Sequence, residues 1–126
     1  MKKEVVATPN APKALGPYSQ AVKVGETLYC SGQIGLDPRT GALVADDVVE
    51  QAKQALRNLK AVLKQAQVSD VVKVTVFMTN IADFQKVNEV YAEFFKESQN
   101  LPARSAVGVK ALPAKALVEI EAVAVK

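Results

Sequence analysis

Histidine and tryptophan are absent from the chain, and Cys30 is the only cysteine among its 126 residues. Without histidine, Ser-His-Asp and Cys-His catalysis are excluded, and so is a zinc site built from cysteine and histidine. A single cysteine cannot form a disulfide within the chain. Cys30 follows Tyr29 in an apolar run, so we expect a small buried side chain there and not a nucleophile.

Long apolar runs and a strong charge bias are also missing. No stretch of about 18 apolar residues occurs, and the opening Met1-Lys2-Lys3 leads into Glu4 and prolines instead of the apolar segment of a signal peptide. Sixteen basic and thirteen acidic residues give a net charge of only +3, with scattered lysines and few aromatics. We therefore expect a protein of the cytoplasm, or of a similarly reducing compartment, that binds neither membrane nor nucleic acid.

What the chain does contain is typical of an ordered globular protein. Hydrophobic residues make up 49% of it and charged residues 23%, far from the composition of disordered chains. At this length, folding buries roughly two thirds of the surface of the unfolded chain. We expect residues 1–126 to form a single domain.

The apolar patterns predict six strands and two helices. Helical spacing begins at a cap, Asp46 or Asp47, and ends at Ala66, and a second amphipathic helix begins at Asp83. Its aromatic residues, among them Phe84 and Tyr91, are expected in the core. Alternating runs predict the strands, the second and third joined as a hairpin, at 5–7, 21–24, 27–31, 71–78, 104–109 and 117–125.

This order of elements, β-β-β-α-β-α-β-β, favours an α+β sandwich in which two helices cover one face of a single sheet. Two helices cannot cover the other face, although the last strands alternate apolar residues on both sides. Such a face needs a partner, and further copies of the chain are the simplest one. The sequence therefore predicts a homo-oligomer.

Arg104 lies inside the short apolar run Pro102–Val107, where an arginine needs an anion. Its guanidinium stays protonated and fits a carboxylate in two parallel hydrogen bonds, so the partner is either a permanent one or a ligand acid. Glu119 and Glu121 share one face of the last predicted strand. From these two segments alone, a structural ion pair between Arg104 and a glutamate is the favoured interpretation.

Six short motifs follow one another along the chain: Gly16–Ala21, Ser31–Ile34, Asp37–Gly41, Val74–Phe77, Pro102–Ser105 and Val118–Ala122. Together they resemble the signatures of the YjgF/RidA (Rid) family of reactive-intermediate deaminases. The resemblance implies a chorismate-mutase-like fold with a mixed sheet. It also implies a homotrimer whose sheets form a central β-barrel, with ligand clefts between neighbouring subunits.

The same resemblance implies an activity, that of a 2-iminobutanoate/2-iminopropanoate deaminase. Such a hydrolase acts on the enamine and imine intermediates that pyridoxal-phosphate-dependent dehydratases release, and it yields 2-oxo acids and ammonia without a cofactor or a metal. Arg104 matches the carboxylate-binding arginine of the family. Glu119 matches the acid that positions or deprotonates the attacking water, and Glu121 is the rival for that role because the strand pattern cannot separate the two.

Five further positions match the substrate cleft of the family. Tyr18 and Ser31 would hydrogen-bond the substrate or its water, although Tyr18 could equally anchor a loop and Ser31 serve a turn. Gly32 would admit the ligand close to the backbone, or serve turn geometry alone. Asn88 would lie near the cleft, or act as an interface or capping group. Ala106 stands where many members have cysteine, so we expect a main-chain role there and no thiol chemistry.

Two functions of other classes compete with the enzyme. Arg104 and a cleft would suffice for a non-catalytic sensor of 2-oxo acids or other small carboxylates. Some relatives are described as ribonucleases or chaperone-like proteins, but a chain without histidine or a concentrated basic patch gives acid-base RNA cleavage little support.

Overall fold

The computed structural model describes residues 1–126 and contains every predicted element in the predicted order. The α+β class, with two helices and one sheet, is confirmed. The third strand is longer than predicted because it continues beyond an irregularity at Ser31 and Gly32, where its register with the last strand shifts. The strands are β1 (Lys3–Val6), β2 (Ala21–Val24), β3 (Thr27–Ile34), β4 (Asp70–Met78), β5 (Ala103–Gly108) and β6 (Val118–Val125).

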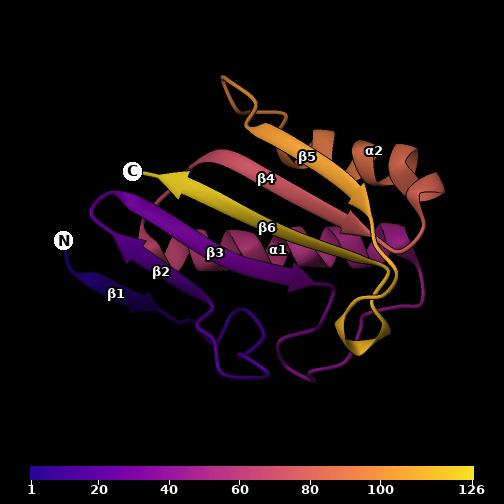
Figure 1. Cartoon of the computed structure of the whole chain (residues 1–126), viewed down its shortest axis with the longest axis horizontal. Coiled ribbons are helices and arrows are strands. Elements are labelled where there is room, and N and C mark those ends of the chain that lie inside the picture. The colour runs from indigo at the N-terminus through magenta and orange to yellow at the C-terminus, as the bar shows by residue number, and fades with distance from the viewer.

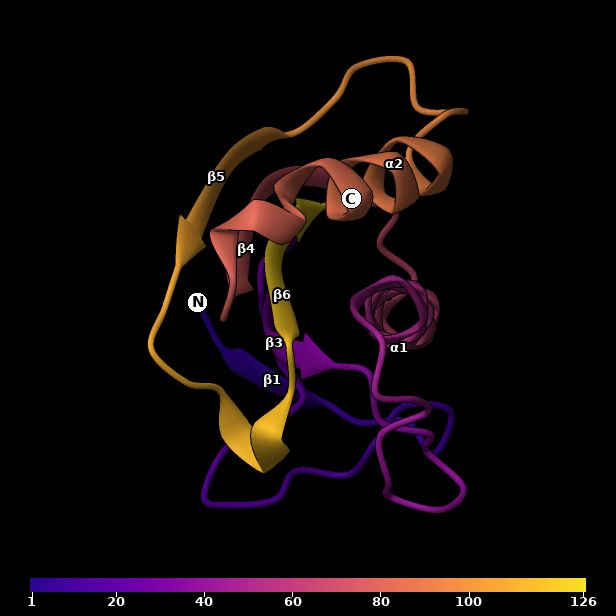
Figure 2. The same ribbon diagram turned by 90° about the vertical axis from the view of Figure 1, so that its right-hand side faces the viewer.

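These strands form one mixed sheet in the order β1-β2-β3-β6-β4-β5, in which only β4 and β5 run parallel. The predicted hairpin joins β2 to β3, and Gly25 takes the positive φ of 60° that its tight turn requires. Both helices lie behind the sheet in Figure 1, and the turned view of Figure 2 shows α1 packed against one side of it. The helices are α1 (Val48–Ala66) and α2 (Phe84–Phe94), and neither is long and apolar enough to cross a membrane.

The helix boundaries agree with the sequence at α1 and differ in detail at α2. Of the two candidate caps for α1, Asp47 fills the role, since its side chain accepts a hydrogen bond of 2.9 Å from the backbone N–H of Glu50. Asp83 makes no capping hydrogen bond. The chain enters α2 through the short 3-10 turn η1 (Ile81–Asp83), whose cap is Asn80. A local turn thus replaces the predicted cap.

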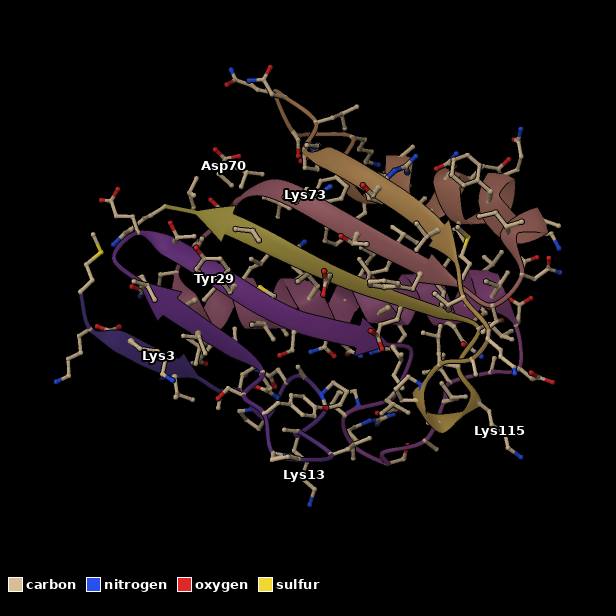
Figure 3. All side chains as sticks on the ribbon, in the orientation of Figure 1. Lys3, Lys13, Tyr29, Asp70, Lys73 and Lys115 are labelled. Carbon is tan, nitrogen blue, oxygen red and sulfur yellow. The ribbon has the colours of Figure 1, made fainter.

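The two faces of the sheet differ in what covers them. On β6, Val118, Ile120, Ala122 and Ala124 face the helices and are buried, whereas the alternate residues face away from them. Two other residues of the uncovered face, Tyr29 and Val107, are 53% and 40% exposed. Figure 3 shows Tyr29 and Lys73 on the side of the sheet that is turned away from the helices. This face is partly apolar and exposed, which agrees with the predicted homo-oligomer, and the oligomer itself stays a prediction.

Two buried polar residues of α1 fasten the ends of the strands that lead to the site. Asn58 donates hydrogen bonds to the carbonyls of Ile34 and Leu36, at 3.2 and 2.9 Å. Gln51 donates to the carbonyl of Ala45 and accepts from the N–H of Leu117, both at 2.8 Å. Because buried amides of this kind are costly to leave unpaired, they fix the end of β3 and the start of β6 against the helix.

The single cysteine lies where the sequence predicted. Cys30 is 7% exposed and packs in the core, and burial raises the pKa of its thiol to about 12. A thiol with such a pKa stays protonated near neutral pH and is a poor nucleophile. The prediction of a small buried side chain is confirmed.

Candidate functional site

A hollow of about 320 Å³ lies where the loop before β2, the end of β3 and the start of β6 meet. Tyr18, Gly32 and Glu119, three of the predicted site residues, line it together. Pro113, from the 3-10 turn η2 (Pro113–Lys115), also lines it. The remaining wall comes from Pro12, Lys13, Leu15, Gly16, Pro17, Gln20, Gln33, Ile34 and Leu36.

Glu119 is the only acidic residue in the wall of this hollow. It is half-buried, and burial raises the pKa of its carboxyl above the usual range, with the nearby charge of Glu121 acting in the same direction. A carboxyl with a raised pKa is a better proton acceptor once it is ionised. The environment of Glu119 therefore suits a general base.

The two glutamates of β6 share a face, as the strand pattern predicts, but they belong to different surroundings. Glu121 is exposed and lines a separate hollow of about 190 Å³, together with Tyr29, Lys73 and Thr75. Lys73 donates to the hydroxyl of Ser105 at 3.1 Å. Only Glu119 lies with Tyr18 and Gly32, a distinction that the sequence pattern could not make.

Gly32 makes room for the Glu119 side chain. A Cβ atom at position 32 would lie 2.5 Å from Oε2 of Glu119 and 2.7 Å from its Cδ, closer than real Cβ atoms approach other atoms. The φ of Gly32 is not among the positive values of the chain, so turn geometry is not the reason for this glycine. The reason is close approach, because the Glu119 carboxylate occupies the space that a side chain at position 32 would need.

Gly32→Ala is therefore expected to displace the Glu119 carboxylate and, for any reaction in which that carboxylate takes part, to lower kcat roughly 10- to 100-fold, because small misplacements of a reacting group carry costs of this size. Gly108→Ala is the matched control, since its added Cβ would meet only ordinary contacts, at 3.5 Å from Ile81 Cβ. Steady-state kinetics of the two variants, with thermal melting to verify folding, measure the difference. Equal activity of Gly32→Ala and Gly108→Ala would contradict the role of Gly32 in making room for the Glu119 carboxylate.

Tyr18 and Ser31 serve the loop that walls the hollow. The Tyr18 hydroxyl accepts a hydrogen bond of 3.2 Å from the N–H of Leu15, while the side chain stays 50% exposed. The Ser31 hydroxyl donates to the carbonyl of Ser19 at 2.6 Å. Tyr18 still borders the hollow, whereas Ser31 does not line it.

Sequence reasoning overlooked Gln20, which holds the same loop from within. Its buried side-chain amide donates to the carbonyls of Thr8, Ala11 and Pro12 at 3.1, 3.3 and 2.8 Å, and it accepts from the N–H of Thr8 at 2.7 Å. The available signal was a long polar side chain immediately before an apolar strand. Gln20 fixes the position from which Tyr18 reaches the hollow.

Arg104 lies elsewhere, between β5 and α2. One guanidinium nitrogen donates to Oδ1 of Asn88 at 2.7 Å, and Cζ lies 4.7 Å from the ring centre of Tyr91 and 5.5 Å from that of Phe84. The predicted structural ion pair with a glutamate is wrong. The ion pairs of the chain are Arg39–Asp37, Lys53–Glu50 and Lys96–Glu93, and none includes Arg104.

The register of the sheet explains why no glutamate reaches Arg104. Arg104 pairs with Val74, which is fully buried on the helix side, whereas Glu119 pairs with Phe77, an odd number of residues further along β4. Because side chains alternate along a strand, Arg104 and Glu119 point to opposite faces of the sheet. Ala106 shares the face of Arg104 and packs against the core. One chain alone does not bring Arg104 and Glu119 together.

A family model and several known proteins match this chain over nearly its full length. The family model described as endoribonuclease L-PSP matches residues 8–126. A RutC family protein of Pyrococcus horikoshii is 53% identical to this chain, with 98% of both chains covered. The human 2-iminobutanoate/2-iminopropanoate deaminase is 52% identical, over 98% of this chain and 90% of the human one.

Solved structures agree with the sequence matches. The crystal structure of E. coli TdcF with bound serine superposes with a TM-score of 0.93 at 45% identity, covering 98% of both chains. Sequence and fold thus match over nearly the full length. The chain belongs to the YjgF/RidA family.

Proposed function

We propose that this chain is a 2-iminobutanoate/2-iminopropanoate deaminase, a hydrolase that converts 2-imino acids into 2-oxo acids and ammonia without a cofactor. The observation that carries the proposal is the pair of complementary groups: a guanidinium without a carboxylate partner at Arg104, and a half-buried carboxyl of raised pKa at Glu119. The human relative that is 52% identical has the name of this activity.

The reaction uses both groups. A 2-imino acid carries its carboxylate beside the electrophilic carbon of a C=N bond, so Arg104 binds the carboxylate and thereby places that carbon. Glu119 accepts a proton from water while the water oxygen bonds to the carbon and the C=N π pair moves to nitrogen, and Glu119 then passes this proton to that nitrogen. In the resulting carbinolamine Glu119 takes the hydroxyl proton and gives it to the amino nitrogen, so that the C–N bond breaks, C=O forms, and ammonia and the 2-oxo acid leave. Water and imino acid thus account for every atom of the products.

Arg104 and Glu119 point to opposite faces of one sheet, which supports a site that takes them from two copies of the chain. We propose a homotrimer in which Arg104 of one copy faces the Glu119 hollow of the next. The uncovered sheet faces, with Tyr29, Val107 and Val123, would then bury one another in a central β-barrel. Serine bound to TdcF has the α-carboxylate and the adjacent nitrogen-bearing carbon of a 2-imino acid, which supports this substrate class.

The proposal is tested by coupling a threonine dehydratase to this protein and following 2-oxobutanoate. Semicarbazide, which traps the imine, is added as a competitor. Wild-type protein should speed oxo-acid release and reduce the trapped fraction. If correctly assembled protein gives no acceleration but still binds 2-oxobutanoate, the carboxylate sensor is the better account. RNA is included as a second substrate, and cleavage that persists in Arg104→Ala and fades on further purification marks a contaminant.

The pH dependence of turnover should reflect Glu119. If its carboxylate takes the proton from water, kcat/KM falls as the pH drops through its pKa, and this acid limb lies above the value of about 4.3 of an ordinary glutamate. Glu121 is one of two causes of the raised pKa, so Glu121→Gln should move the acid limb to lower pH. Every other group around Glu119 is the same in the two proteins, so the difference between their pH–rate profiles isolates Glu121. Superimposable pH–rate profiles would contradict the effect of Glu121 on the pKa of Glu119.

A further inference from the structure

One face of α2 is turned toward the Arg104 guanidinium. Phe84, Asn88 and Tyr91 follow one another at spacings of four and three residues, which places them on one stripe of the helix. All three contact or approach the same group, Asn88 by a hydrogen bond and the two rings through their faces. The sequence predicted both aromatic residues in the core, but Phe84 is 36% exposed and only Tyr91 is buried.

The contacts leave most of the guanidinium available. Arginine has five N–H donors, and only one hydrogen bond from the Arg104 side chain is made within the chain. A guanidinium that stacks on aromatic rings and is held at one nitrogen has a defined plane, while its other donors remain free for a ligand. An arginine held in this way loses less conformational freedom when a carboxylate binds.

We propose that Phe84, Asn88 and Tyr91 form a cradle that fixes the plane of the Arg104 guanidinium for a ligand carboxylate, with Tyr91 as its principal positioning residue. The inference rests on the proposed function only in giving Arg104 a carboxylate to bind. Tyr91 has the closer ring, and it is itself locked by Phe95, whose ring centre lies 4.7 Å away. The cradle thus connects the core of the helix layer to the group that binds substrate.

The ring of Tyr91, and not its hydroxyl, is the part that acts. The hydroxyl is the one buried side-chain polar atom of the chain without a hydrogen-bond partner. Burial raises the pKa of this hydroxyl and the charge of Arg104 opposes the rise, so it stays protonated and neutral. A hydroxyl that is sealed from solvent cannot contact a ligand, whereas the ring face does contact the guanidinium.

Three substitutions separate the ring from general packing. Tyr91→Leu removes the aromatic face and should raise the Kd for 2-oxobutanoate roughly five- to thirtyfold, the range of a cation–π contact from the upper limit of exposed settings to a desolvated one. Tyr91→Phe keeps the face and should bind within about twofold of wild type. Phe94→Leu is the matched control, because Phe94 is a partly buried aromatic of the same helix that contacts Phe95 and not Arg104. Titration calorimetry measures the three affinities.

A spectroscopic signal tests the cradle without turnover or ligand. The guanidinium N–H resonances of Arg104, assigned by their loss in Arg104→Lys, should be shifted upfield by the ring currents of Tyr91 and Phe84. Tyr91→Leu should remove most of this shift, and Tyr91→Phe and Phe94→Leu should retain it. If wild-type protein binds no 2-oxo acid, the proposed function fails. The upfield shift of the Arg104 guanidinium resonances still tests the cradle in that case, because it needs no ligand.

Two outcomes overturn the cradle. Equal weakening of 2-oxobutanoate binding by Tyr91→Leu and Phe94→Leu would assign both effects to packing of the helix. Weak binding by Tyr91→Phe, with the guanidinium shift intact, would assign the effect to the hydroxyl and not to the ring. Selective weakening by Tyr91→Leu, together with loss of the shift, supports it.

Discussion

Arg104→Ala is expected to lower kcat/KM by roughly 10²- to 10⁴-fold, because it would remove the two charge-assisted hydrogen bonds that we propose to the substrate carboxylate. Arg104→Lys keeps the charge and should still lose roughly 10- to 100-fold, since an ammonium cannot make the two-pronged contact or stack on Tyr91 and Phe84. Both substitutions should raise KM and lower kcat, because the carboxylate contact also aligns the C=N carbon with its water.

Kinetics of the coupled dehydratase reaction measure these losses, and Arg57→Ala is the matched control. Arg57 is an exposed arginine on α1 that hydrogen-bonds Gln54, far in sequence from both groups of site residues. Its removal should leave turnover unchanged. Arg104→Ala should also remain folded, because the only hydrogen-bond partner that it leaves is Asn88, which is half-buried and can bind water instead. Full activity of Arg104→Ala in well-folded protein would rule out Arg104 as the substrate-binding group.

The fold was predictable from the sequence because its periodicities are regular and local. The α1 helix and the alternation of β6 rest on the spacing of apolar residues, which responds directly to whether one face of an element is buried. The first strand begins two residues earlier than predicted and β5 is displaced by one residue. The differences at β3 and at Asp83 lie at a register shift and a short turn, where local hydrogen bonds decide and periodicity says little.

The relation between Arg104 and Glu119 could not be predicted in the same way. Each lies in a recognisable strand, but whether two strands present their side chains to one face depends on register through β4, which pairs with both. The sequence pattern alone favoured an ion pair, and the register places the two charges on opposite faces. Likewise, the sequence shows Asn88 and Tyr91 only as a polar and an aromatic position of an amphipathic helix. Their contact with Arg104 depends on the position of β5 beside α2, which the sequence pattern does not give.

Because Arg104 and Glu119 point to opposite faces of the sheet in one chain, we expect two inactive variants to recover activity when they form mixed oligomers. Arg104→Ala keeps Glu119, and Glu119→Gln keeps Arg104, so a mixed oligomer contains one interface at which an intact Arg104 meets an intact Glu119. In a trimer with ring symmetry, any mixture of two copies of one variant and one of the other has one such interface, so activity should return to about one third of wild type. Each variant alone should stay near zero.

The experiment co-expresses the two variants with different affinity tags, isolates mixed oligomers by successive purification on both tags, and measures turnover in the coupled assay. The matched control pairs Arg104→Ala with the double variant Arg104→Ala/Glu119→Gln, which forms mixed oligomers but offers no intact interface. Recovery in the first mixture and none in the control would mean that the site takes its arginine and its glutamate from neighbouring copies. Mixed oligomers as inactive as their parents would show that Arg104 and Glu119 do not act in one site between copies, and the proposed assembly would have to be abandoned. Because the register of β4, β5 and β6 keeps these two side chains apart within a chain, recovery is the outcome that this sheet requires if both act on one substrate.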